Sequence, residues 1–313
     1  MERVILDVDT GIDDALAIIY AIKSKEIHLE GITTGFGNVT NEQATSNTLR
    51  VIELAEPSYS IPVAMGAEKP LYRPKRPTVA HVHGQNGIGD YTLPEPKQKA
   101  LDEHAADFIV RKINENVNEL TLLFVGRLTN LALALKKDPS IVGKVKGLVL
   151  MGGALQTYGN VTGWAEANIY GDPDAAKEVF ESGLSITMVG LDVTRKADFR
   201  EEHLNRLMDK MSPEKEALSS FIKHIVTFGF EASEKMEEGR QRLLHDPLAV
   251  GVVINPTFVQ TENYHVYVEN EGKYTTGATI ADYRKPQTDT NASVCLGLKR
   301  EEFINHFINT ISS

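Results

Sequence analysis

Residues 4–15, Val4-Ile5-Leu6-Asp7-Val8-Asp9-Thr10-Gly11-Ile12-Asp13-Asp14-Ala15, decide the fold. A short apolar run leads into acidic residues and a glycine, and a helical pattern follows from Asp13 to about Lys23. This strand, turn and helix is the first of several along the chain. Further strands are predicted at 27–36, 61–65, 120–125, 147–151, 186–191 and within 258–283, and further helices at 41–55, 103–116, 128–137, from 173, mainly over 201–240, at 248–253 and at 301–311.

Strand and helix signals alternate over most of the chain, which predicts one α/β domain spanning 1–313 with a mostly parallel sheet and helices on both faces. Two long stretches, 68–98 and 153–171, interrupt this rhythm and are predicted to be loops. Asp172 is a plausible N-cap with Pro173 at the first helical position. In such a sheet, ligands bind beyond the carboxyl ends of the strands.

Composition narrows the class of protein. The 313 residues are 42% hydrophobic and 24% charged, as in an ordinary soluble globular protein. The net charge of −10 disfavours general nucleic-acid binding, because an acidic surface repels phosphates. No apolar run is long enough for a membrane span or a signal peptide, and the single cysteine excludes an intrachain disulfide. A cytoplasmic location is therefore expected.

Four aspartates lie within eight residues: Asp7, Asp9, Asp13 and Asp14. Asp7 and Asp9 share one face of the predicted strand, whereas Asp13 and Asp14 fall in the first helical turn. Acids at a helix N-terminus are favourable in their own right, but that explains only one or two of the four. Clustered carboxylates without cysteine suit a hard divalent cation, Ca²⁺ or Mg²⁺.

Other polar groups are more ambiguous. Asp246, after His245, is favoured as a simple N-cap, although the pair could also face a site. His83 lies in a His-x-His pattern, for which zinc is disfavoured and a role as acid or hydrogen-bond donor is preferred. Asn38 is a turn residue by default. Residues 160–168 carry Asn160, Glu166 and Asn168, which suit recognition of sugar hydroxyls or an ordinary solvated loop.

Taken together, these segments resemble the nucleoside hydrolase family, also called the inosine-uridine preferring nucleosidases. No single piece suffices, but the set covers nearly the whole chain in order. The segments are DVDTGIDDA (7–15), TTGFGN (33–38), HVHG (81–84), VGRLTNLA (125–132), VLMGGA (149–154), GNVTGWAEANIYGDPDAA (159–176), VGLDVT (189–194) and HDPLAV (245–250).

The resemblance implies a Rossmann-like single domain, usually a homodimer or homotetramer, that hydrolyses the N-glycosidic bond of ribonucleosides with one bound Ca²⁺. Its base preference would be of the inosine–uridine type or for pyrimidines. The implied metal ligands are the carboxylates of Asp9, Asp14 and Asp246 and the backbone carbonyl of Val125. The implied ribose contacts are Asp13, Asn160, Glu166 and Asn168.

For the chemistry, the resemblance implies that Asp9 is the general base and that Asn38 lies near the nucleophilic water. His245 would sit beside the departing base, and His83 is a second candidate acid. The chain departs from the family at three positions. Thr10 and Arg127 stand where proline is frequent, and Ala167 stands where phenylalanine is frequent.

Two other functions are compatible with parts of the sequence. Asp7 and Asp9 after an apolar strand also resemble the first motif of haloacid-dehalogenase-like phosphatases, with 171–174 as a later acidic motif. That function leaves Asp13, Asp14 and the later polar groups without a role. A non-catalytic ribosyl-binding protein would keep the ribose contacts but would not need Asp9 as a base.

Overall fold

Eight strands form the central sheet of the computed structural model, which describes residues 1–284 and 288–313. All neighbouring strands run parallel except the edge strand β9, which is antiparallel to β12. The predicted fold class, an α/β domain with a mostly parallel sheet, is therefore confirmed. In spatial order the strands are β3 (Val63–Met65), β2 (Ile27–Thr34), β1 (Glu2–Val8), β4 (Leu120–Phe124), β5 (Gly147–Met151), β6 (Ile186–Val189), β12 (Ala292–Leu298) and β9 (Val259–Tyr264).

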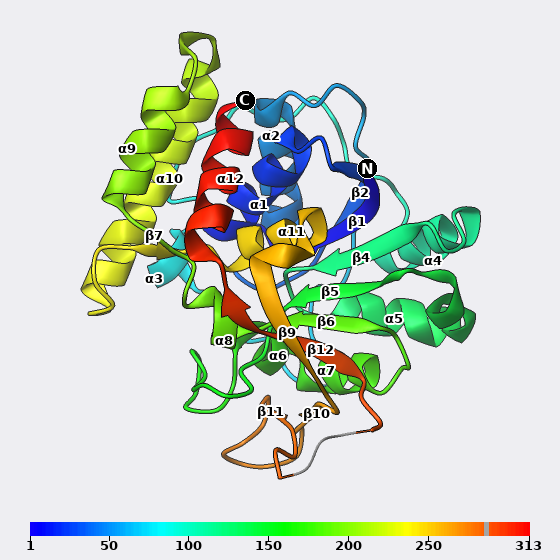
Figure 1. Ribbon diagram of the computed structural model, residues 1–313. Coiled ribbons are helices and arrows are strands. Elements are labelled where there is room, and N and C mark those ends of the chain that lie inside the picture. Colours follow the sequence, from blue (N-terminus) through cyan, green and yellow to red (C-terminus); the bar gives the residue numbers. More distant parts are fainter. Residues whose placement is uncertain (285–287) are drawn as a thin grey trace.

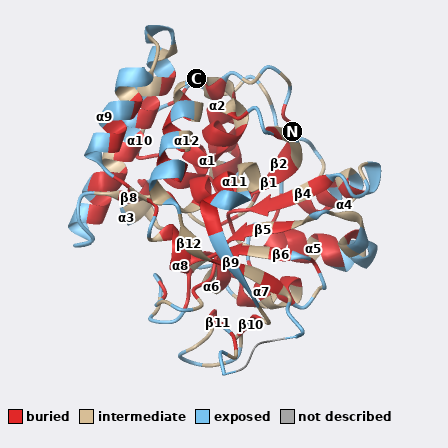
Figure 2. Ribbon diagram, in the orientation of Figure 1, coloured by how far each residue is buried: buried red, intermediate tan, exposed pale blue. Residues whose placement is uncertain are grey.

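Helices cover both faces of this sheet, and each face has its own hydrophobic core (Figure 1). One face carries α1 (Ile12–Lys23), α2 (Asn41–Ala55), α11 (His245–Ile254) and α12 (Arg300–Ser312). The other carries α4 (Ala105–Glu115), α5 (Thr129–Lys137) and α7 (Pro173–Phe180). Figure 2 shows that β1, β4 and β5 are buried, whereas α9 (Glu201–Lys210) exposes much of its outer surface.

Shorter elements complete the chain. The described residues include α10 (Glu216–Lys235), which lies beside α9 in Figure 1, and three short helices, α3 (Ala80–His83), α6 (Ala167–Gly171) and α8 (Leu191–Thr194). The 3₁₀ turns are Pro139–Lys144, Pro213–Lys215 and Pro256–Phe258. Two small ribbons pair β7 (Asp198–Phe199) with β8 (Arg242–Leu243) and β10 (Tyr267–Val268) with β11 (Thr279–Ile280).

The strand order reverses beside β1. From β1 the chain moves to β2 and β3 on one side, and it then returns to place β4, β5 and β6 on the other. The carboxyl ends of β1 and β4 are therefore adjacent, and the loops that leave them diverge. Such a switch point is where open α/β sheets bind ligands.

Several predicted boundaries were wrong. The two stretches predicted as loops contain α3 and α6, and Leu191 begins α8 instead of ending a strand. Asp246 is not an N-cap, because α11 begins one residue earlier and Leu244 occupies the cap position. The strand β12 was not predicted.

Asp172 does cap α7, as predicted: its side chain accepts a hydrogen bond from the Ala175 N–H at 3.1 Å, and Pro173 follows at the first helical position. In the part of the chain that the structure describes, no helix is both long and apolar enough to cross a membrane.

Candidate active site

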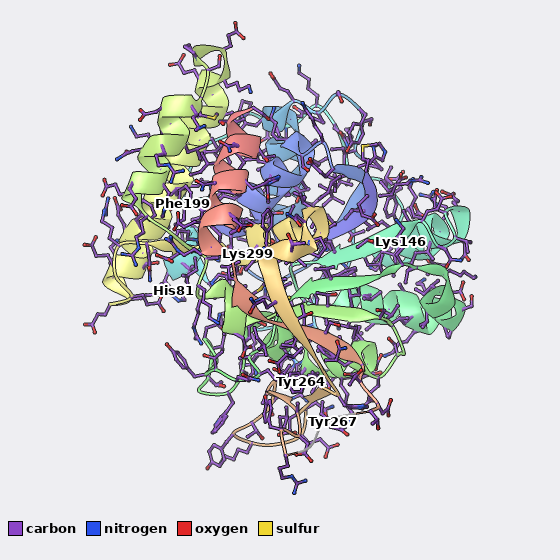
Figure 3. All side chains as sticks on the ribbon, in the orientation of Figure 1. His81, Lys146, Phe199, Tyr264, Tyr267 and Lys299 are labelled. Carbon is purple, nitrogen blue, oxygen red and sulfur yellow. The ribbon has the colours of Figure 1, made fainter. Side chains whose placement is uncertain are left out.

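A cavity of about 420 Å³ opens at the carboxyl ends of the central strands. Its walls come from segments far apart in sequence, and α3 packs against α10 at one side, where Figure 3 labels His81. The polar residues that line it are Asp13, Asn38, His81, His83, Asn160, Glu166, Asn168, Arg195, Ser233, Glu238, Arg242, His245 and Asp246. All the predicted side-chain ligands and contacts except Asp9 and Asp14 are therefore on this wall, and those two lie directly behind it.

Asp9 follows β1 and is 2% exposed. Its carboxylate accepts two hydrogen bonds from Asn38, one from the backbone N–H at 2.8 Å and one from the side-chain amide at 3.1 Å. The Nη1 of Arg127 forms an ion pair with the same carboxylate. These contacts fix the orientation of Asp9. Asn38 is therefore more than a turn residue, because it holds the Asp9 carboxylate in place.

The start of α1 holds a second carboxylate. Asp14 accepts hydrogen bonds from the N–H groups of Gly11 at 2.8 Å and Asp9 at 3.0 Å. It also accepts one from the Asn38 side chain at 3.1 Å, so that Asn38 bridges Asp9 and Asp14. Both backbone donors are at or before the helix N-terminus, where partial positive charge favours an anion.

Among the described residues, the carboxylates of Asp13, Asp14 and Asp246 converge, with one oxygen of each lying within 4.8 Å of the others. All three residues are buried, and they come from both ends of the chain. No thiol or imidazole belongs to this group. Three buried oxygen donors suit a hard divalent cation, so the residues present fit the ion that the resemblance implies.

Burial raises the pKa values of Asp14 and Asp246 well above their usual range, and the neighbouring aspartates add to the effect. The pKa of Asp9 is also raised by burial, although Arg127 opposes the shift. Burial acts in the same direction on Asp13, but Arg242 and the weaker effects of His83, His245 and a backbone N–H together lower the pKa of that carboxyl. A bound cation would offset the mutual repulsion that these shifts report.

Glu166 and Asn168 lie at the start of α6. The Glu166 side chain is the N-cap of this helix and accepts hydrogen bonds from the N–H groups of Asn168, Ile169 and Gly153, between 2.8 and 3.1 Å. The Asn168 amide donates to the backbone carbonyl of Val125 at 2.8 Å. The structure thus places two predicted ribose contacts, Glu166 and Asn168, next to the backbone carbonyl of Val125, a predicted metal ligand.

Asn160 lies at the rim. It is exposed, and its side-chain oxygen accepts a hydrogen bond from the Ala167 N–H at 2.9 Å. Its contact with a sugar stays a prediction.

The two histidines are held differently. The Nδ1 of His83 accepts a hydrogen bond from the Ile12 N–H at 2.9 Å, which places the proton of the neutral ring on Nε2. The Nδ1 of His245 lies 2.8 Å from the hydroxyl of Thr194. Burial, reinforced by Arg242, lowers the pKa of His83 to about 3 and that of His245 to about 4. Both rings are therefore neutral near pH 7.

Sequence reasoning missed the roles of three side chains. Arg127 was noted only as a departure from the family, yet it reaches Asp9. Arg242 forms a buried ion pair with Asp13 at 2.7 Å, and Thr194 contacts His245. Arg127 could have been predicted to reach the site, because it closely follows an apolar strand. No feature of the sequence predicts that Arg242 reaches it.

The phosphatase alternative would require Asp7 as a nucleophile. Asp7 is 1% exposed and does not line the cavity. One of its oxygens accepts hydrogen bonds from Thr33 at 2.6 Å and Asn130 at 2.8 Å. Asp7 therefore belongs to the packing beneath the site, and this alternative is not favoured.

Known proteins match this chain over almost its full length. The family model described as inosine-uridine preferring nucleoside hydrolase matches residues 4–305. Uridine nucleosidase 1 of Arabidopsis thaliana is 40% identical over 282 residues, which is 90% of this chain and 82% of the plant protein. The pyrimidine-specific ribonucleoside hydrolase RihA of Salmonella paratyphi B is 36% identical over 308 residues, 96% of each chain.

A solved structure is similarly close. The purine-preferring ribonucleoside hydrolase from Gardnerella vaginalis superimposes with a TM-score of 0.93 at 38% identity, covering 99% of this chain and 98% of the other.

Proposed function

The chain belongs to the inosine-uridine preferring nucleoside hydrolase family and is an N-ribosyl hydrolase, and we propose that it cleaves uridine and other pyrimidine ribonucleosides in a reaction that depends on Ca²⁺. One observation carries the proposal. Buried carboxylates from α1 and α11 gather at the switch point of the sheet, beside a cavity that Glu166 and Asn168 also line.

We propose that Asp14 and Asp246 hold the ion, with Asp9 and the Val125 carbonyl as further ligands. Asp13 is in the same group of carboxylates and is proposed to contact the ribose hydroxyls. A hard divalent cation at such a position supplies coordination for a water and for vicinal hydroxyls, but it acidifies water much less than zinc does. A carboxylate base is therefore still required.

Asp9 is the proposed base. Its oxygens are oriented by Asn38, and the raised pKa brings its basicity closer to neutrality. Glu166 and Asn168 are proposed to hold the ribose. Their positions are fixed by the helix cap and by the Val125 carbonyl, so that the sugar is oriented without rearrangement of the loop.

Cleavage passes through an oxocarbenium-like state, as in glycoside hydrolysis generally. The aspartates provide negative potential close to the sugar, which stabilises developing positive charge. At the other end, His245 is proposed to donate a hydrogen bond to the departing base. The predicted homodimer or homotetramer and the cytoplasmic location stay predictions from the sequence.

The base preference rests on the names of relatives. A uridine nucleosidase and a pyrimidine-specific hydrolase support pyrimidines, whereas the Gardnerella protein, of comparable identity, is described as purine-preferring. A preference for purine nucleosides is therefore one possible outcome of the test.

The test is a turnover panel of uridine, cytidine, inosine, adenosine and guanosine, with free base and ribose both quantified in the presence of Ca²⁺. We expect equal amounts of base and ribose, with the highest kcat/KM for uridine, and loss of turnover in excess chelator. Highest kcat/KM for inosine would replace the pyrimidine preference. Full activity in chelator would refute the role of the metal, and no ribose from any substrate would refute the function.

A further inference from the structure

Arg127 reaches into the carboxylate cluster from the end of β4. Its side chain is 10% exposed, and Nη1 forms an ion pair with Asp9 and lies 3.4 Å from the side-chain oxygen of Asn168. Asn38 also donates to Asp9, with its backbone N–H to the oxygen Oδ2 that Arg127 contacts and its side-chain amide to Oδ1. The guanidinium therefore occupies the side of Asp9 that faces the sugar-binding residues.

Two glycines make room for this side chain. A Cβ at Gly37 would overlap the guanidinium, and a Cβ at Gly171 would lie 2.7 Å from Cγ and Nε of Arg127. The Nε of Arg127 is buried without a hydrogen-bond partner in the described structure. Leaving a buried donor unpaired costs free energy, so the attraction between Nη1 and Asp9 has to outweigh that cost.

Asp9 differs from the other acids of the site in having Arg127 as its ion-pair partner. The three carboxylates that converge are those of Asp13, Asp14 and Asp246, and Asp9 is not among them. We propose that Arg127 is a counter-cation of Asp9 that holds its carboxylate and competes with the metal ion for it. This inference rests on the metal site in the proposed function, and it goes beyond that function by assigning a residue that sets metal affinity.

Formal charges support this role. With all four aspartates ionised, the cluster carries four negative charges, and the ion pairs with Arg127 and Arg242 offset two of them. The remaining two negative charges match one divalent cation. Without Arg127 three negative charges would remain, which favours any cation more strongly and a trivalent cation most of all.

The experiment measures Ca²⁺ and Tb³⁺ binding to chelator-treated full-length protein by calorimetry, for wild type and Arg127→Met. We expect the Kd for Ca²⁺ to fall by at least about tenfold in the variant, and the Kd for Tb³⁺ to fall further, because a buried opposing charge has been removed. The matched control is Arg195→Met. Arg195 lines the same cavity, but it bonds the backbone carbonyls of Tyr158 and Gly159 and is in none of the ion pairs of the described residues.

The control is expected to change the Kd for Ca²⁺ by no more than about threefold, since its charge is not in contact with a carboxylate. An unchanged or weakened affinity in Arg127→Met, or an equal gain in Arg195→Met, would overturn the inference while leaving the metal site intact. Absence of Ca²⁺ binding by both wild type and Arg127→Met would overturn the metal site and the inference together.

Arg127→Gln is the second variant, because it removes the charge and shortens the side chain but keeps a hydrogen-bond donor. It is expected to show the same direction of change. If Arg127→Met unfolds without metal, circular dichroism during Ca²⁺ titration should show refolding. If this variant stays unfolded, the same binding measurements on Arg127→Gln decide the inference.

Discussion

His245 could assist the departing base either as a protonated imidazolium or as a neutral ring that donates a hydrogen bond from Nε2. Replacing Thr194 by valine distinguishes these two roles. The Thr194 hydroxyl lies 2.8 Å from Nδ1 of His245, and Thr194 is fully buried. When this hydroxyl donates to Nδ1, the proton of the neutral ring is on Nε2, the nitrogen left to contact the base. Valine has nearly the same shape but cannot hold that tautomer.

The size of the effect follows from the pKa of His245. Burial lowers that pKa to about 4, so at pH 7 only about one ring in a thousand is protonated, and forming the imidazolium costs about 4 kcal/mol. A neutral Nε2–H donor avoids this cost. Loss of one neutral hydrogen bond is worth about 0.5–1.5 kcal/mol, so Thr194→Val should lower turnover of uridine by about 2- to 13-fold. His245→Ala removes the donor and should lower it by about 10²- to 10⁴-fold.

The assay compares uridine with a riboside whose leaving group is p-nitrophenolate, which departs without a proton. We expect both variants to keep turnover of the activated riboside within about threefold of wild type, because the assisted step is bypassed. The kcat/KM for uridine should also show no His245-dependent change between about pH 5.5 and 8, since the ring is neutral throughout. Equal losses on both substrates would show that His245 only maintains the pocket.

Three further predictions concern the acids and the turn beside them. Burial raises the pKa of Asp7 from 3.8 to about 7, so the folded state binds this proton more tightly than the unfolded chain, and the resulting stabilisation is full below about pH 4 and lost as the pH rises to 7. The free energy of unfolding should therefore decline by about 4 kcal/mol over that range because of Asp7, and Asp7→Asn should remove this decline. An unchanged pH profile in urea titrations of the variant would contradict the prediction. Gly37→Ala should lower kcat by more than about tenfold with normal circular dichroism, because the added Cβ overlaps Asp9, and wild-type kcat would show that the loop yields freely. Asp14→Asn should abolish the rise in melting temperature on Ca²⁺ addition, because it removes one of three converging carboxylates, and a retained rise would place the ion elsewhere.

The central strands were predictable from their short apolar runs. The strands β1, β4 and β5 each contain such a run, and their positions, like that of β2, were predicted within a few residues. The strand β12 was not predicted because its run, ASVCLGL, has little alternation and contains a register shift between Cys295 and Gly297. Helix α6 is five residues long, too short for a period of 3.6, and its main signal is the Glu166 side chain that caps it.

The location of the site was predictable for a topological reason. Residues that follow parallel strands meet at one edge of the sheet, so Asp9 and Val125 had to lie near each other once the strand order placed β1 beside β4. The ion pairs were not predictable in this way. Arg242 and Asp13 are separated by 229 positions, and Arg242 fits only because a Cβ is absent at Gly229, where one would lie 2.9 Å from Cδ of Arg242. Such contacts depend on the paths of side chains, which strand and helix patterns do not encode.

The distribution of charge links these observations to the reaction. Two guanidinium groups offset half of the charge of the four aspartates, and the two remaining negative charges match the divalent cation that we propose to bind there. If arginines neutralised all four aspartates, no negative charge would remain to attract the ion. If no arginine were present, mutual repulsion would favour protonation of the aspartates. Both histidines, which we propose to lie at the base end, are neutral, because burial and Arg242 lower the pKa of each. A neutral donor placed there can assist an electron-rich leaving group without adding a positive charge that would oppose the developing oxocarbenium ion.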